Sequence, residues 1–398
     1  HDVTQIDEAY REAEQHDAPT FIIARTLKGK GAVVVENKEG WHGVAMNAEQ
    51  AKEAIAELGG ARSLSVTPAP PAEFKATNGG SPVHLPAYTD GIATRKAFGE
   101  TLAALAARPD VVVLDAEVGN STFTEDFEKV APERFVQMFI AEQTMIGAAI
   151  GLQVTGKTPY AATFGAFLTR AYDFIRMGAV SRANIRLCGS HAGVSIGQDG
   201  PSQMALEDLA MMRAVQGSTV LYPADGNSTA KLVAAMADRQ GISYIRTTRE
   251  KTNLLYGADE PFPIGGSKVL RSSPDDKVTL VGAGVTVHEA LKAADALAAA
   301  GVKARVIDAY SVKPIDAATL GKALGDTGLM VVIEDHWAEG GLGDAVLAAL
   351  AEGGKPLRGR VVKLAVTQMP GSGKPEELRD WAGISSEKIV EAVRKSLA

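Results

Sequence analysis

Residues 135–190 read FVQMFIAEQTMIGAAIGLQVTGKTPYAATFGAFLTRAYDFIRMGAVSRANIRLCGS, and this stretch decides the fold. Short apolar runs at 135–140, 159–164 and 184–189 alternate with longer segments of helical periodicity at 142–154 and 168–180. The apolar runs are nearly continuous, which is typical of strands that are buried on both faces. Their order predicts a parallel β-sheet with helices on both sides.

The same alternation continues in both directions along the chain. A helix at 94–108 and a strand at 111–117 precede the stretch, and two further helix–strand units follow it up to residue 248. We therefore expect one α/β domain over 90–255. After a break at 256–275, strands at 277–284, 303–309 and 329–335 and helices at 287–301 and 341–352 predict a second parallel-sheet α/β domain over 276–398.

The first 62 residues contain too few predicted helices and strands to form a domain by themselves. They contain a predicted helix at 6–15, a predicted strand at 20–26 and a helix that begins near Asn47. One strand and two helices cannot bury both faces of a sheet, so we expect a remnant of a third domain. Residues 63–89, rich in Pro, Ala, Gly and Ser, are expected to be a linker. Because the chain opens on His1 and not on Met, we expect a fragment or a processed chain.

Composition narrows the classes of function. The net charge of -7 and the pI near 5.6 argue against nucleic acid as the main partner, so an anionic substrate would require local groups of Arg and His. Cys188 is the only cysteine, which excludes an internal disulfide and suits a reducing, cytoplasmic compartment. The chain has no run of about 18 apolar residues, so we expect no membrane span.

The most informative side chains lie where predicted strands end. Glu142 stands between an apolar strand and an apolar helix, and Phe164 and Phe167 follow the next strand, with Arg170 shortly after them. A Glu in the first turn of a helix often does no more than favour the helix dipole, and such aromatics are often core residues. Together, however, a carboxylate and aromatic rings at neighbouring strand ends can hold an aminopyrimidine ring.

Six segments extend this pattern, and with them the chain resembles the transketolase family. They are STFTEDF, FIAEQTM, TFGAFLTRAYDFIRM, CGSHAGVSIGQDGPSQMALEDLAM, VTLVGAGVTVHEAL and IEDHWAEGGLG. The resemblance covers Pro19 to Ala398 and is nearest to the shorter, animal-like branch. It implies a pyrimidine-binding domain and a C-terminal domain, with most of the N-terminal diphosphate-binding domain lacking.

The resemblance implies that the protein transfers a two-carbon ketol unit from a ketose phosphate to an aldose phosphate in the pentose phosphate pathway. Its cofactor would be thiamine diphosphate, and its partner a second copy of the chain. Residues of the resembling motifs take three roles. The catalytic ones would be Glu142, His42, His191 and Gln203; the cofactor-binding ones Glu142, Phe164, Phe167, Lys28 and Arg170; and the substrate-binding ones Arg95, Ser121, His191, Asp199, Arg249 and His42. Gln203 stands where many relatives carry His, so hydrogen bonding is its expected role.

Two other motifs point to chemistry that we do not expect. Gly282–Ala283–Gly284 followed by Asp308 imitates a dinucleotide fingerprint, but Val287 stands where the third glycine is needed. Glu334, Asp335, His336 and Glu339 form an acidic cluster whose spacing fits no metal-ligand pattern, so a strand–loop–helix joint is the expected structure. We assign no metal ligand in this chain.

The chain lacks the Gly-Asp-Gly motif with which thiamine diphosphate enzymes hold the diphosphate and its divalent ion. We expect Mg²⁺ or Ca²⁺ with ligands outside this chain, supplied by a missing N-terminal segment or a partner polypeptide. Two alternatives remain open. One is a sister enzyme, deoxyxylulose-phosphate synthase or a β-type subunit of a 2-oxo acid dehydrogenase, against which GQDGPSQMALED argues. The other is a non-catalytic subunit that retained the fold.

Overall fold

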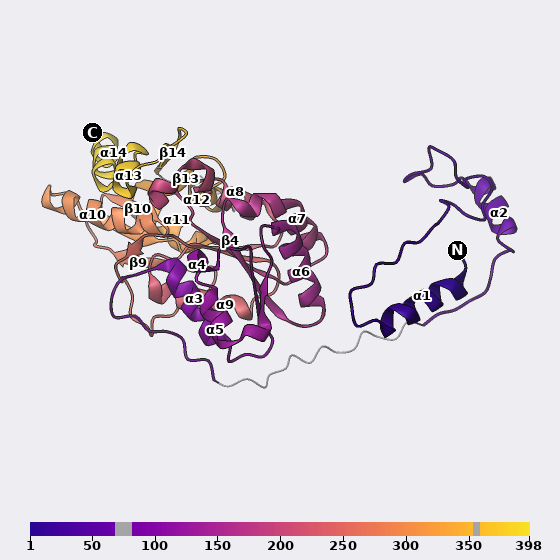
Figure 1. Cartoon of the computed structure of the whole chain (residues 1–398). Helices are drawn as coiled ribbons and strands as arrows, with labels where there is room; N and C mark the ends of the chain where they lie inside the picture. Colours follow the sequence, from indigo (N-terminus) through magenta and orange to yellow (C-terminus); the bar gives the residue numbers. More distant parts are fainter. Residues whose placement is uncertain (68–81, 353–358) are drawn as a thin grey trace. The chain divides into compact units, whose positions relative to one another are not determined.

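The computed structural model describes residues 1–67, 82–352 and 359–398. The chain divides into two compact units, residues 1–73 and 74–398, which are treated separately below (Figure 1). Residues 68–81, which belong to the expected linker, lie outside the described part.

The first unit contains two helices, α1 (Val3–Gln15) and α2 (Ala48–Glu57). Asp2 and Asn47 cap them by accepting hydrogen bonds from backbone N–H groups of the first turn, as is usual for Asp and Asn. The predicted strand at 20–26 is wrong: this segment has no regular secondary structure and pairs with no strand in the described part of the unit. A strand forms only beside a hydrogen-bonded neighbour, and the described part of this unit offers none. Phe21 and Ile23 accordingly remain 90% and 79% exposed.

A seven-stranded sheet forms the first half of the second unit and has the order β12-β6-β7-β5-β4-β2-β3. Its strands are β2 (Val111–Asp115), β3 (Phe135–Gln137), β4 (Thr158–Phe164), β5 (Arg186–Ser190), β6 (Thr219–Leu221), β7 (Ser243–Arg246) and β12 (Ser311–Lys313). Every pair is parallel except β12 with β6. This confirms the predicted parallel sheet. Beside it, β1 (Ile92–Ala93) pairs antiparallel with β8 (Lys251–Thr252).

Helices cover both faces of this sheet. Their bounds are α3 (Thr94–Leu105), α4 (Gly119–Thr122), α5 (Glu125–Val130), α6 (Glu142–Val154), α7 (Tyr172–Val180), α8 (Asp208–Ala214) and α9 (Gly226–Ala237). Side chains of α3, α5 and α9 share one buried apolar cluster with the strands, while those of α6, α7 and α8 share another. In Figure 1, α6 and α7 lie together, as do α3, α5 and α9. The predicted helix 142–154 coincides with α6.

The second sheet has the order β14-β13-β10-β11-β9 and is parallel apart from β9. Its strands are β9 (Lys268–Arg271), β10 (Val278–Gly282), β11 (Ala304–Asp308), β13 (Leu329–Trp337) and β14 (Arg360–Val366). The helices are α10 (Val285–Ala299), α11 (Ala317–Thr327), α12 (Leu342–Ala351), α13 (Pro375–Trp381) and α14 (Ser386–Leu397). Strand β9 lies inside the segment 256–275 that we expected to be a linker.

The two sheets share one apolar core. The cluster on the α6 face of the first sheet continues into side chains of β10, β13, α11 and α12, and β12 crosses over to become the edge strand of the first sheet. At the start of α10, a Cβ on Gly284 would lie 2.1 Å from the ring of Tyr222, and Gly284 has φ +59°. Only glycine therefore fits at this position, where Tyr222 packs against the start of α10.

Among the described residues, no helix combines the length and the apolar character that a bilayer crossing requires.

Candidate functional site

The candidate site lies at the carboxyl ends of the central strands β2, β4, β5 and β7. Because these strands are parallel neighbours, their carboxyl ends meet at one edge of the sheet, the usual place for ligands in open α/β sheets. Four segments leave the sheet at this edge: 116–124, 165–171, 191–207 and 247–250. They carry most of the side chains that the sequence singled out.

Three rings form a stack at the ends of β4 and β5. The ring of Phe164 stacks on that of Phe167, with 5.2 Å between the centroids and 7° between the planes. It also stacks on the ring of His191, with 4.0 Å between the centroids. His191 adopts φ 55°, which is rare for a residue with a side chain. Its Nδ1 lies 3.0 Å from the Ser190 hydroxyl, which fixes the ring orientation and leaves Nε2 for a ligand.

Glu142 is the first residue of α6 and is only 3% exposed. Its Oε2 lies 3.3 Å from Nη1 of Arg170, whose side chain is 59% exposed. Arg170 belongs to the 3₁₀ segment Phe167–Ala171, which packs against α6. The carboxylate and the aromatic stack are therefore attached to adjoining elements, as the sequence predicted for an aminopyrimidine site.

A second group contains the two predicted phosphate-binding arginines. Arg95 Nη1 donates a hydrogen bond to the carbonyl oxygen of Ser121 (2.9 Å), and Arg249 Nη1 lies 3.0 Å from Asp199 Oδ1. Burial lowers the pKa of Arg95, the charge of Arg249 lowers it further, and that of Asp199 raises it. Two like charges and one acid therefore interact at this edge. An anion bound between the arginines would relieve their repulsion.

Burial lowers the pKa of His191 to about 3, and the charges of Arg95 and Arg249 add to the effect. The imidazole is therefore neutral at pH 7. As a neutral ring it can accept or donate one hydrogen bond through Nε2, according to its tautomer.

Three further predicted residues are Gln203, Lys28 and His42. Gln203 ends the 3₁₀ segment Pro201–Gln203 and is half-buried, but its amide forms no hydrogen bond with the other predicted side chains. Lys28 and His42 are exposed and belong to the first unit, whereas the groups above belong to the second. Ser121 contributes its carbonyl oxygen and not its hydroxyl.

Sequence reasoning missed one residue that shapes the site. Asp115, the last residue of β2, is fully buried and accepts hydrogen bonds from Thr122 Oγ1 (2.7 Å), Thr124 Oγ1 (2.8 Å) and the Val118 N–H (2.7 Å). It thereby holds the turn that presents Ser121 to Arg95. An Asp at the end of an apolar strand, followed by two Thr residues, was the available signal.

The described side chains fit one end of thiamine diphosphate. Stacked aromatic rings and a buried carboxylate suit its pyrimidine ring. For the charged end, residues 1–67, 82–352 and 359–398 contain no group of three or more His, Cys, Asp or Glu side chains that could hold a metal ion. The cluster Glu334, Asp335, His336 and Glu339 is no such group, and burial raises the pKa of Glu334 to about 7.

Three family models match the chain. They are described as "Transketolase, thiamine diphosphate binding domain" at residues 1–78, "Transketolase, pyrimidine binding domain" at 90–253 and "Transketolase, C-terminal domain" at 267–389. Among curated proteins, the chain is 47% identical to transketolase-like protein 2 of Mus musculus and 44% identical to transketolase of Homo sapiens. It aligns over 100% and 99% of its length, but spans only 65% and 64% of theirs.

Solved structures give the same result. One described as a split gene transketolase, inactive beta4 tetramer, is 39% identical, with a TM-score of 0.69 over 77% of this chain and 98% of that one. Transketolase from Campylobacter jejuni has a TM-score of 0.82 at 20% identity, over 99% of this chain and 66% of that one, which shows a common fold.

The low pKa of His191 predicts a pH-dependent stability. Its side chain takes up a proton near pH 6.5 when unfolded but only near 3 when folded, so its contribution is present above pH 6.5 and is lost as the pH falls toward 3. The unfolding free energy of His191→Gln should therefore fall less steeply with decreasing pH than that of the unchanged protein. The difference in slope should be up to about 1.4 kcal/mol per pH unit in this window. Urea unfolding at pH 7, 6 and 5 measures it, with His84→Gln, at an exposed position, as control. Parallel pH curves for His191→Gln and the unchanged protein would contradict the assignment.

Proposed function

The chain belongs to the transketolase family, and from this premise we propose that it forms the catalytic part of a transketolase that moves a two-carbon ketol unit between sugar phosphates. The observation that carries the proposal is the meeting of three features at one sheet edge. These are the buried Glu142, the Phe164–Phe167 stack and the arginine pair Arg95 and Arg249. The first two suit the cofactor's pyrimidine, and the third suits the phosphate of a sugar phosphate.

Each group has a role that its surroundings support. Thiamine diphosphate, when bound, supplies the nucleophilic carbon and electron sink for carbon–carbon cleavage. Phe164 and Phe167 orient the pyrimidine, and Glu142 holds a proton at a pyrimidine nitrogen. Neutral His191 offers Nε2 to a sugar hydroxyl, and Asp199 accepts a hydrogen bond from another.

The phosphate group would act on His191 as well as on the arginines. Arg95 and Arg249 both lower the pKa of His191. A phosphate between them offsets their charge, so a bound sugar phosphate should raise the pKa of the imidazole. Phosphate binding and proton transfer at His191 are thereby coupled.

We propose a homodimer with the cofactor site at its interface. The support is the apolar surface around Glu142, where Phe139, Ile140, Phe174 and Met177 are 65%, 69%, 41% and 44% exposed. Large apolar side chains next to a ligand site are typical of a surface that a partner covers.

The diphosphate and its Mg²⁺ or Ca²⁺ would be held by further polypeptide. The exposed Phe21 and Ile23 support this, because an exposed apolar segment is suited to be covered by further polypeptide. Since the chain spans about 65% of its curated relatives, that polypeptide could be the same protein's upstream part or a separate subunit. A cytoplasmic location is part of the proposal.

A non-catalytic subunit is the second candidate. It is favoured by the similarity to transketolase-like proteins and to a solved chain whose description calls its tetramer inactive. Retention of Glu142, His191 and Arg249 favours the catalytic alternative.

Complementation separates the two candidates. The chain alone should bind thiamine diphosphate weakly and turn over xylulose 5-phosphate with ribose 5-phosphate slowly, because the described residues offer no metal clamp for the charged end of the cofactor. Adding a polypeptide with the Gly-Asp-Gly segment should restore magnesium-dependent turnover. Failure of such a polypeptide to bind, or a bound complex with no turnover, would support the non-catalytic subunit.

Glu142→Gln tests the pyrimidine site. In the complemented enzyme, this change should leave folding intact and lower the turnover number strongly, since an amide cannot take up the proton that a carboxylate shares with the ring nitrogen. Hydrogen–deuterium exchange at the cofactor's reactive carbon measures the affected step. An unchanged exchange rate would remove Glu142 from this role.

Arg249→Gln tests the phosphate site. A charge-assisted contact contributes about 1.5–3 kcal/mol, so catalytic efficiency with xylulose 5-phosphate should fall about ten- to a hundredfold. Hydroxypyruvate with an unphosphorylated acceptor should be nearly unaffected. Lys251→Gln, at an exposed residue two positions away, is the matched control. Equal losses with both donors would mean that Arg249 supports the fold or the cofactor.

A further inference from the structure

We propose that Asp335, at the end of β13 in the C-terminal sheet, is a positioning residue for the segment 191–203, called here the substrate loop. The loop carries His191, Asp199 and Gln203, and their contact with the sugar rests on the proposed function. The C-terminal half of the chain would then determine the geometry of a site that the first sheet carries.

The substrate loop is inserted into the core of the C-terminal half. Val194 and Ile196 are 0% and 1% exposed, and they share one apolar cluster with side chains of the second sheet and its helices. Members of that cluster include Leu280, Ile333 and Leu378. The loop therefore does not lie on the surface as most connections do, so its shape depends on what surrounds it.

Asp335 makes the polar contacts within this insertion. It is 1% exposed, and its Oδ1 accepts a hydrogen bond from the Val194 N–H (2.7 Å), while Oδ2 accepts a weaker one from Ser195 N–H (3.4 Å). Gly193, with φ +91°, allows this approach, because a Cβ there would lie 2.1 Å from Asp335 Oδ2. The contact begins two residues after His191.

The residues after Asp335 form hydrogen bonds with the chain just beyond the loop. The Trp337 N–H donates to the Leu206 carbonyl (2.9 Å), and the Ala210 N–H donates to His336 Nε2 (3.3 Å). On the other side of the loop, Gly200 lies close to Ser372: a Cβ added to Gly200 would be 2.7 Å from the Ser372 hydroxyl oxygen. The end of β13 and the segment before α13 thus hold the loop at two places.

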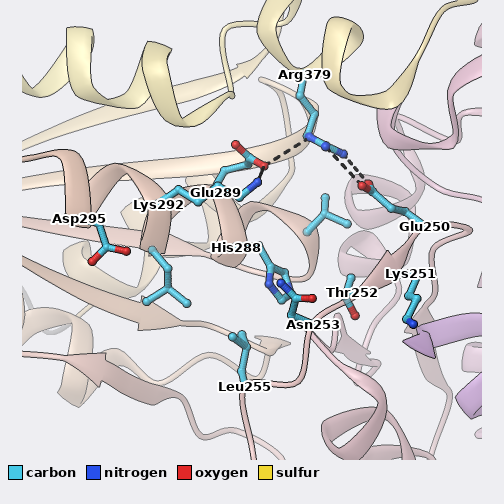
Figure 2. A pocket seen from close by; sticks show the side chains of 12 residues that line it. Glu250, Lys251, Thr252, Asn253, Leu255, His288, Glu289, Lys292, Asp295 and Arg379 are labelled. Atoms are coloured by element: carbon cyan, nitrogen blue, oxygen red, sulfur yellow. Dashed lines mark hydrogen bonds and ion pairs between the residues drawn. The ribbon is translucent and has the colours of Figure 1, made fainter. Parts of the chain in front are cut away.

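A second connection to the C-terminal half involves Glu250, the residue after Arg249. Figure 2 shows Arg379 of α13 between Glu250 and Glu289, beside a pocket of about 260 Å³. Arg379 Nη2 lies 3.4 Å from Glu250 Oε1, and its Nε lies 3.6 Å from Glu289 Oε1. Both sides of the Asp199–Arg249 ion pair are therefore tied to the C-terminal half.

The charge of Asp335 matters to this arrangement. Burial lowers the pKa of Arg246, but the charge of Asp208, with smaller contributions from Tyr222, Asp335 and Tyr244, outweighs it and raises the pKa. Against the effect of burial, the pKa of Arg379 is raised chiefly by Glu250, then by Glu289 and, to a smaller extent, by Asp335. A carboxylate here accepts from two N–H groups and balances buried cations, whereas an amide of the same shape has one acceptor oxygen and no charge.

Asp335→Asn in the full chain is the test, with hydrogen exchange of the substrate loop as the first readout. Loss of a charge-assisted hydrogen bond should speed exchange at the Val194 and Ser195 amides about ten- to a hundredfold, while β4 amides keep their rate. Gly193→Ala should loosen the same peptide from the other side. Asp275→Asn, on the surface of the same half, is the matched control. It should change exchange neither at the Val194 and Ser195 amides nor at the β4 amides.

The second readout is kinetic and uses the complemented enzyme. Asp335→Asn should lower the catalytic efficiency with xylulose 5-phosphate while leaving proton exchange at the cofactor's reactive carbon unchanged, because Glu142 and Phe167 lie on other elements. Unchanged loop exchange in both variants, or faster exchange throughout residues 82–398, would overturn the proposal, and so would a loosened loop with unaltered efficiency. If the complemented enzyme had no turnover at all, the proposed function would fail while loop exchange still decided the anchoring role.

Discussion

Parallel pairing of β2, β4, β5 and β7 is the constraint on which the candidate site depends. Parallel strands all end at the same edge, so the residues after each strand are brought together even where dozens of positions separate them in the sequence. Phe164 meets His191 for this reason. Arg95 follows β1, and the antiparallel pair of β1 with β8 brings its N–H to the Thr248 carbonyl. The same pairing requires helices on both faces, which accounts for the apolar character of α3 and α6.

Buried charged side chains are a second constraint on the structure. Asp208 and Arg246 form an ion pair with both side chains fully buried, and Asp115 and Asp335 accept backbone and hydroxyl hydrogen bonds in the interior. An uncompensated buried charge is costly, so these groups favour one arrangement of the loops around them. The more exposed Arg249 and Arg170 differ, because their carboxylate partners could be exchanged for a ligand.

The two sheets are also interdependent. Strand β12 completes the edge of the first sheet, Tyr222 packs on Gly284, and the substrate loop enters the second core. With so much apolar surface shared, the second unit is best regarded as one body in which the C-terminal half contributes to the shape of the site and not only to stability. In this view, the acidic segment around Asp335 has a proposed structural role, whereas the spacing of its residues only excluded a known metal-ligand pattern.

The sequence by itself determined the parallel α/β class, the bounds of α6 and the family, because apolar periodicity and local motifs are properties of neighbouring residues. It also singled out Glu142, Phe164, His191, Asp199 and Arg249, whose roles stay predictions. Only the tertiary structure decided that 20–26 is no strand, that β9 lies at Lys268–Arg271, and that Asp115 and Asp335 accept hydrogen bonds from Thr122 and Val194. These depend on partners that are distant in sequence: a strand needs a neighbour, and a buried carboxylate needs donors whose positions folding alone brings within reach.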